Sequence, residues 1–151
     1  MNAGPIALAL GLALALAGCA GPTPYRDDIT PKNVSIRTST ASDVRAVVGV
    51  HGVDARCRAR YLGMVALDKP SVALGIPQER WSYLLFEFAT SSFLGSSQSA
   101  VSKGTLLKPR AGYRYEVDVS YRDDIYNVVV RERSPRGTLR EIPLLELSSC
   151  G

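Results

Sequence analysis

The chain has 151 residues, enough for one domain of ordinary size with its own hydrophobic core. Its net charge of +4 comes from 18 Lys and Arg against 14 Asp and Glu, and none of these lies in residues 1–18. This mild excess falls short of the clustered basic surface that marks a nucleic-acid-binding protein. We therefore expect no nucleic-acid partner.

Residues 6–17 are almost entirely Ala and Leu, and a cysteine, Gly and Pro follow shortly after. As a helix this stretch reaches about 18 Å, against about 30 Å of membrane hydrocarbon, so it is too short to span a bilayer. It has the length of the apolar region of a secretory signal peptide. The alternative is a buried N-terminal helix with Cys19 in the core, but a helix that is apolar all round needs burial on every side.

The end of this run, Leu16-Ala17-Gly18-Cys19, resembles the lipobox of bacterial lipoproteins. The resemblance implies that residues 1–18 are a cleaved signal peptide. It also implies that Cys19 carries a diacylglyceryl group and an N-acyl chain such as palmitate; several acyl chains anchor a protein stably. No other cofactor is expected.

Ala20 follows the cysteine. In the enterobacterial sorting rule an Asp at this place retains a lipoprotein at the inner membrane, so the sequence resembles that of an outer-membrane lipoprotein. We expect the chain to be anchored in a bacterial outer membrane, with its domain facing the periplasm.

Residues 20–32, AGPTPYRDDITPK, contain three prolines and no apolar periodicity. This composition predicts a semi-rigid spacer that would hold the domain roughly 40 Å from the anchor. The chain is thus divided into a signal peptide (1–18), a lipidated cysteine with its tether (19–32) and a β-sandwich domain (33–151).

From residue 33 on, the hydrophobic pattern has mostly a period of two, which predicts β-strands. Residues 113–121 and 126–130 read as a hairpin, 81–89 as a central strand that is apolar on both faces, and 74–77 as a short edge strand. Ser134-Pro135-Arg136-Gly137 fits a type I turn. Seven or eight short strands separated by turns predict an all-β fold, an antiparallel immunoglobulin-like β-sandwich.

The segment LLKPRAGYRYEVDV, residues 106–119, resembles the E–F corner of fibronectin type III and related immunoglobulin-like domains. The matching residues are Leu107, Pro109, Gly112, Tyr115, Val117 and Val119. The resemblance implies that the phenol of Tyr115 forms a hydrogen bond with the backbone a few residues upstream.

Two cysteines remain once Cys19 carries lipid. An even pair in an exported protein suggests a disulfide, here between Cys57 and Cys150. In the chain-entropy model a loop of this length contributes about 4–5 kcal/mol. The alternative is two free thiols, with Cys57 buried and Cys150 at a frayed end.

The sequence offers little for catalysis. Its one histidine, His51, has no Gly-x-Ser-x-Gly nucleophile motif to work with, and one histidine cannot supply a zinc site. We expect no catalytic residues, no metal and no enzyme activity, and we interpret His51 as a turn or strand-end residue.

The first candidate binding surface is formed by Arg56, Arg58 and Arg60, which alternate with Ala55, Cys57, Ala59 and Tyr61 in a pattern typical of a half-buried strand. Such an arginine ladder suits phosphate and carboxylate groups. The alternative is a solvated face whose charges pair with Glu116 and Asp118 on another strand.

The second candidate lies in residues 90–104, where Ser and Gly dominate and predict a long mobile loop. Phe93 and Leu94 within it either pack back on the edge of the sandwich or present an apolar tip to a protein partner.

The leading hypothesis is therefore a non-enzymatic, lipid-anchored module that binds or scaffolds an envelope protein. The alternative is binding of an anionic envelope polymer or glycolipid, such as peptidoglycan or lipopolysaccharide, through the arginine face. A third hypothesis is a hydrolase, or an inhibitor of one.

Overall fold

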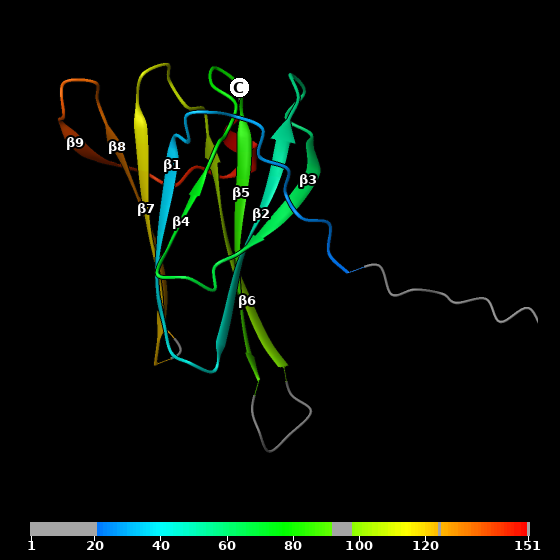
Figure 1. Ribbon diagram of the computed structural model, residues 1–151. Helices are drawn as coiled ribbons and strands as arrows, with labels where there is room; N and C mark the ends of the chain where they lie inside the picture. The colour runs from blue at the N-terminus through cyan, green and yellow to red at the C-terminus, as the bar shows by residue number, and fades with distance from the viewer. Residues whose placement is uncertain (1–20, 92–97, 124, 151) are drawn as a thin grey trace, which may run out of the picture.

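The computed structural model describes residues 21–91, 98–123 and 125–150 of the chain. Within these residues nine strands form two sheets that face each other, as Figure 1 shows. In chain order they are β1 (Val34–Thr40), β2 (Val44–Val53), β3 (Ala59–Ala66), β4 (Ser71–Leu74), β5 (Ser82–Ser91), β6 (Gln98–Leu107), β7 (Arg114–Arg122), β8 (Ile125–Arg133) and β9 (Leu139–Ile142). The all-β sandwich expected from the sequence is confirmed.

One sheet has five strands in the order β4-β1-β7-β8-β9, and the other has four in the order β3-β2-β5-β6. Neighbouring strands are antiparallel except β1 and β7, which run parallel. Strands β2 to β6 lie between these two in the sequence and provide the long connection that a parallel pair needs. The sandwich is therefore mostly antiparallel, and the parallel pair was not expected.

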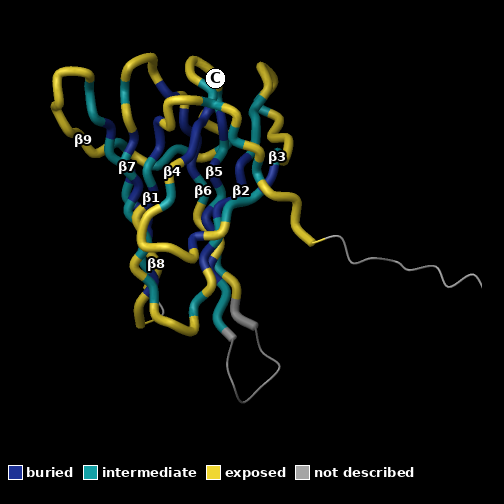
Figure 2. Tube along the Cα trace, in the orientation of Figure 1, coloured by how far each residue is buried: buried dark blue, intermediate teal, exposed yellow. Residues whose placement is uncertain are grey.

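The core lies between the two sheets, where the inner faces of the strands meet (Figure 2). Because successive side chains of a strand point to opposite faces, every second residue enters this core. Its buried residues include Val48, Val50, Leu84, Phe86 and Phe88 from one sheet and Ile36, Val117, Val119, Val128 and Val130 from the other. As predicted, β5 is an interior strand, between β2 and β6.

The second half of the chain follows the sequence pattern closely. Strands β7 and β8 form the predicted hairpin, and the N–H of Gly137 donates to the carbonyl of Ser134 at 2.9 Å in the predicted turn. The backbone N–H of Arg110 donates to the phenol of Tyr115, five residues downstream, at 3.0 Å. This is the bond that the tyrosine-corner resemblance implied, although one shared corner does not assign the chain to a family.

The N-terminal segment corrects the expectation of a spacer. Residues 23–33, called the strap below, lie along the sandwich instead of leading away from it. The strap forms an isolated bridge with β3 at Pro24 and Met64, and hydrogen bonds join it to the residues that follow β4. Composition did not reveal this docking, because the contacts are made with residues far along the chain.

The Ser- and Gly-rich segment is the other correction. We expected a loop over residues 90–104, but β5 continues to Ser91 and β6 begins at Gln98. Pairing with β5 therefore overrides the low strand propensity of these residues. The register places Lys103 opposite Phe86, and β6 is the outermost strand of its sheet.

Helical structure in the described ranges amounts to one 3-10 turn, Leu147–Ser149. After the turn at residues 134–137, the chain returns in the short strand β9, which ends at Ile142. No helix in this part of the chain is long and apolar enough to cross a membrane.

Candidate functional site

The predicted strand over residues 55–61 is wrong in its first half. Residues 54–58 form the turn between β2 and β3, and Cys57 has a left-handed φ of 59° there. The Asp54 carboxylate accepts hydrogen bonds from the backbone N–H groups of Arg56 at 2.9 Å and Arg58 at 3.0 Å. Asp side chains favour such turns by bonding to nearby backbone, and this preference outweighed the alternating pattern.

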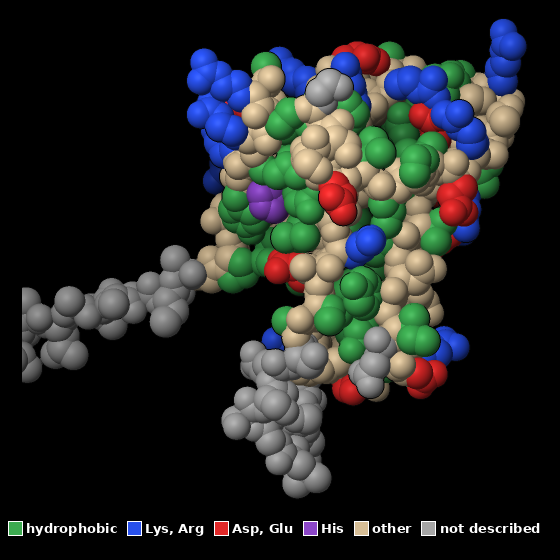
Figure 3. Space-filling view, turned by 180° about the vertical axis from the view of Figure 1, so that it is seen from behind, with side chains coloured by type: hydrophobic (Ala, Val, Ile, Leu, Met, Phe, Trp, Pro, Cys, Tyr) green, Lys and Arg blue, Asp and Glu red, His purple; other side chains and the backbone are tan. Residues whose placement is uncertain are grey.

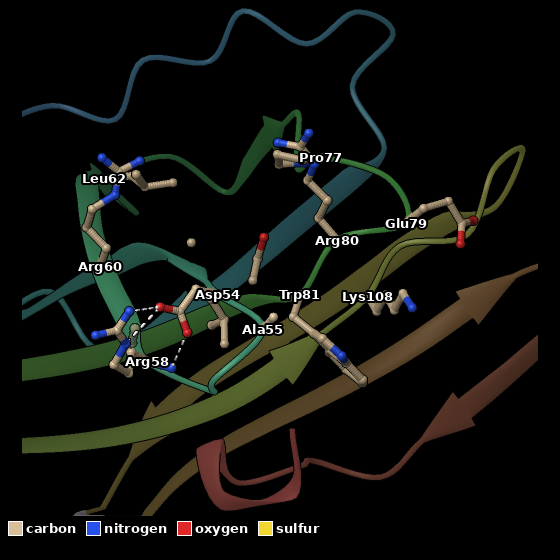
Figure 4. A pocket seen from close by; sticks show the side chains of 14 residues that line it. Asp54, Ala55, Arg58, Arg60, Leu62, Pro77, Glu79, Arg80, Trp81 and Lys108 are labelled. Carbon is tan, nitrogen blue, oxygen red and sulfur yellow. Dashed lines mark hydrogen bonds and ion pairs between the residues drawn. The ribbon is translucent and has the colours of Figure 1, made fainter. Parts of the chain in front are cut away.

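The turn forms one wall of a pocket with a volume of about 680 Å³ at one end of the sandwich. The opposite wall comes from the segment between β4 and β5 and from the residue after β6. Figure 4 shows Arg58 and Arg60 on the first side and Arg80 and Lys108 on the other. Apolar parts of the lining come from Val53, Leu62, Pro77 and Trp81.

The charges around the pocket are unevenly neutralised. Arg58 is paired with Asp54, at 2.7 Å between Nη2 and Oδ2. Backbone and side-chain hydrogen bonds from Arg58 hold the pKa of Asp54 below its ordinary value. In the described ranges no carboxylate lies within ion-pair distance of Arg60, Arg80 or Lys108. Three cations therefore remain available to a ligand.

Trp81 adds an aromatic side chain to the lining of the pocket. The ammonium of Lys108 lies 5.8 Å from the centre of the indole ring, within the range of a cation–π interaction. Glu79, the second acid in the lining, accepts a hydrogen bond from the backbone N–H of Ala111 at 3.1 Å. This contact directs its carboxylate toward the loop before β7.

The arginine ladder predicted from the sequence does not exist as one face. Arg56 lies in the turn and does not line the pocket, whereas Arg58 and Arg60 do. The alternative pairing is also wrong: the carboxylates of Glu116 and Asp118 lie on the outer face of the other sheet. Their partners there are Arg37, Arg131 and Arg133.

Sequence reasoning missed Arg80, Trp81 and Lys108. Arg80 and Trp81 directly precede β5, and Lys108 directly follows β6. Because β5 and β6 are antiparallel neighbours, the start of one and the end of the other meet at the same end of the sheet. The sequence does show a basic residue at each of these two strand ends. Only the knowledge that β5 and β6 are neighbours, however, indicates that the two residues meet.

The two remaining cysteines, 93 residues apart, lie next to each other: the thiol of Cys57 contacts the carbonyl oxygen of Cys150. Both are free thiols in the structure. A side-chain hydrogen bond with Cys150, followed by burial, raises the pKa of the Cys57 thiol to about 11. The C-terminal segment is thus held against the turn that forms the pocket wall.

His51 lies near the end of β2, on the outer face of the four-stranded sheet. Its ring centroid is 5.3 Å from that of Tyr61 and 6.0 Å from that of Tyr83. Figure 3 shows this histidine, the only one in the chain, among hydrophobic side chains. Its Nδ1 is buried without a hydrogen-bond partner among the described residues. The imidazole ring of His51 is therefore packed against the rings of Tyr61 and Tyr83.

Glu132, at 7% exposure, is a buried carboxylate on β8. Its Oε2 accepts from Arg110 Nε at 3.0 Å and Tyr115 Oη at 3.2 Å, and its Oε1 from Arg140 Nη2 at 3.0 Å. Burial alone would raise the pKa of Glu132, but these hydrogen bonds outweigh it and hold the pKa below its ordinary value. The hydrogen bonds of Glu132 therefore hold the tyrosine corner, with Arg110 and Tyr115, against β8 and β9.

The other predicted site residues, Cys19, Phe93 and Leu94, lie outside the described residues. Within the described part of the chain no three His, Cys, Asp or Glu side chains gather closely enough to hold a metal ion. Comparison of the chain with models of protein families, with curated proteins and with solved structures finds no match.

Proposed function

We propose that the protein is a lipid-anchored, non-enzymatic binding module of the bacterial envelope that takes anionic groups of an envelope polymer or glycolipid in the pocket around Trp81. The observation that carries this proposal is the set of three cations, Arg60, Arg80 and Lys108, that line one pocket without an ion-pair partner in the described chain. The envelope location and the lipid on Cys19 rest on the lipobox resemblance.

The chemistry of the lining supports an anionic ligand. Guanidinium groups present fixed, planar donors that fit carboxylate and phosphate oxygens in pairs. The indole of Trp81 adds a flat apolar surface beside them, which suits a ligand with both a ring and an acidic substituent. The hypothesis of a protein partner docking on Phe93 and Leu94 has no comparable support, since those residues are not described.

The test measures binding of detergent-purified, lipidated protein to lipopolysaccharide and to purified peptidoglycan by co-sedimentation. We expect Arg60→Ala and Arg80→Ala each to weaken binding about five- to tenfold, because each removes one charge-assisted contact of about 1–1.4 kcal/mol. Raising the salt concentration should weaken wild-type binding as well, because it screens exposed charges.

The matched control is Arg136→Ala, in the turn between β8 and β9, which removes the same charge from an exposed position outside the pocket. An equal loss with this control would show general charge attraction and contradict a pocket site. Unchanged binding in the Arg60 and Arg80 variants would contradict it too. The anchor is checked separately by intact mass, which should show a chain that begins at Cys19 and carries acyl groups.

A further inference from the structure

The strap is bound to the sandwich at both of its ends. Near its start, the N–H of Tyr25 donates to the carbonyl of Met64 at 2.8 Å, and the N–H of Met64 donates to the carbonyl of Thr23 at 2.9 Å. At its end, the Asn33 side chain exchanges two hydrogen bonds of 2.8 Å with the backbone of Ile76. The strap therefore links the edge of one sheet, β3, to the segment after β4 at the edge of the other.

Contacts in the middle of the strap hold it along its whole length. The phenol of Tyr25 donates to the carbonyl of Gly75 at 2.9 Å, and the N–H of Gly75 donates to the Asp27 carboxylate at 2.7 Å. Lys32 lies 2.8 Å from the same carboxylate. Burial and the nearby acids Asp27 and Asp28 raise the pKa of Tyr25, as expected of a phenol that the strap holds against the sandwich.

Two glycines of the sandwich allow this close approach. A Cβ at Gly63 would lie 2.6 Å from the Tyr25 nitrogen, and one at Gly75 would lie 2.6 Å from the Ile29 carbonyl oxygen. Real Cβ atoms do not come so near to backbone atoms, so the strap fits only because both positions lack a side chain.

The reach of the anchor follows from this docking. Cys19 precedes Thr23 by four positions, and four residues span at most about 14 Å in any conformation. We propose that the β3 side of the sandwich, where the strap begins, faces the lipid bilayer and lies close to its surface. This inference rests on the lipid anchor of the proposed function. It replaces the roughly 40 Å spacer that the composition of residues 20–32 predicted.

The experiment places a fluorophore at Ala66 or at Thr138 of the lipidated protein, one at a time, through a bio-orthogonal residue. Ala66 is exposed at the end of β3 in one sheet, and Thr138 is exposed next to β9, the outermost strand of the other sheet. Figure 1 shows the strands β3 and β9 on opposite sides of the molecule. Energy transfer is measured to an acceptor lipid in vesicles of phosphatidylethanolamine and phosphatidylglycerol. A domain of this size is roughly 30 Å across, so transfer should be several-fold stronger from Ala66 than from Thr138.

Two variants should release the strap, one by a change in the sandwich and the other by a change in the strap itself. Gly75→Ala adds a methyl group where Asp27 and Ile29 lie, and Asp27→Ala removes the bond to Gly75 and the ion pair with Lys32. Either should reduce the difference between the two labels. Gly21→Ala is the control, since a Cβ there meets nothing within 4 Å, and it should leave the difference unchanged.

Equal transfer from both labels in a wild-type chain whose mass shows acylated Cys19 would overturn this inference alone. A difference that persists in a folded Asp27→Ala variant would overturn the role of the strap even if Gly75→Ala fails to fold. A chain without acyl mass would overturn the anchor, and the inference with it, whereas binding to the pocket is measured separately.

Discussion

The carboxylate of Glu132 joins the loop before β7, the tyrosine corner and the last strand through its bonds to Arg110, Tyr115 and Arg140. A buried carboxylate with several charged donors stabilises a fold only while it is ionised. Its depressed pKa therefore makes the stability of the sandwich depend on pH.

We expect Glu132→Gln to lower the free energy of unfolding at pH 7 by about 2 kcal/mol, since it replaces charge-assisted hydrogen bonds by neutral ones. The folded-state pKa of Glu132 is lowered, so its contribution is present above the ordinary Glu value of about 4.3 and is lost as the pH falls further. The difference between wild type and variant should shrink in that acidic range.

The measurement is urea unfolding at a series of pH values between neutral and strongly acidic. Glu141→Gln on β9 is the control, because Glu141 is exposed and has no ion-pair partner in the described chain. A variant of Glu132 that is as stable as this control at pH 7 would contradict the role assigned to the buried carboxylate.

At the scale of elements, the turn over residues 54–58 and the C-terminal segment meet at Cys57 and Cys150. We propose that the two thiols form a disulfide under oxidising conditions by exchange with a disulfide donor, which is reduced in the process.

Cys57→Ser should therefore lower the melting temperature of protein purified under oxidising conditions, because it removes a cross-link worth up to about 4–5 kcal/mol in the chain-entropy model. After reduction with dithiothreitol, wild type and variant should melt at similar temperatures. A difference that is the same before and after reduction would mean that Cys57 acts through packing and not through a disulfide.

The sequence predicted the elements whose hydrophobic alternation is uninterrupted. Residues 114–122 and 125–133 became a hairpin, and the doubly apolar stretch from Trp81 became an interior strand. Prediction from the sequence failed where a side chain or a neighbouring strand, and not the hydrophobic pattern, determines the backbone conformation. Asp54 makes a turn out of an alternating segment, and pairing with β5 makes a strand out of Ser- and Gly-rich residues.

At the scale of the whole molecule, the sandwich followed from the number and spacing of strands, but the pocket did not. Of its cations, Arg58 and Arg60 were candidates from the sequence, whereas Arg80 and Lys108 required the order β3-β2-β5-β6 to bring them together. The strap was missed for the same reason, since its partners Met64 and Gly75 lie some 40 to 50 residues further along the chain.

The register of β6 has a consequence for self-association. Over the described residues, β6 has no neighbouring strand on the side away from β5, although the C-terminal segment covers its last residues there, where the N–H of Leu106 donates to the carbonyl of Leu145 at 2.8 Å. Such an edge can recruit another copy of the chain unless something blocks it. Lys103 is exposed at the position opposite Phe86, so its charge would have to be desolvated in any continuous sheet formed across two molecules.

Lys103→Val should therefore increase light scattering and oligomer formation in concentrated solutions of the protein while leaving the fold intact. Ser102→Val, one position earlier and opposite Glu87 on the other face, adds an equal apolar side chain without removing the charge. If both variants aggregate equally, the added apolar side chain alone is responsible; if only Lys103→Val aggregates, the charge of a single lysine protects this strand edge from pairing with a second copy of the chain.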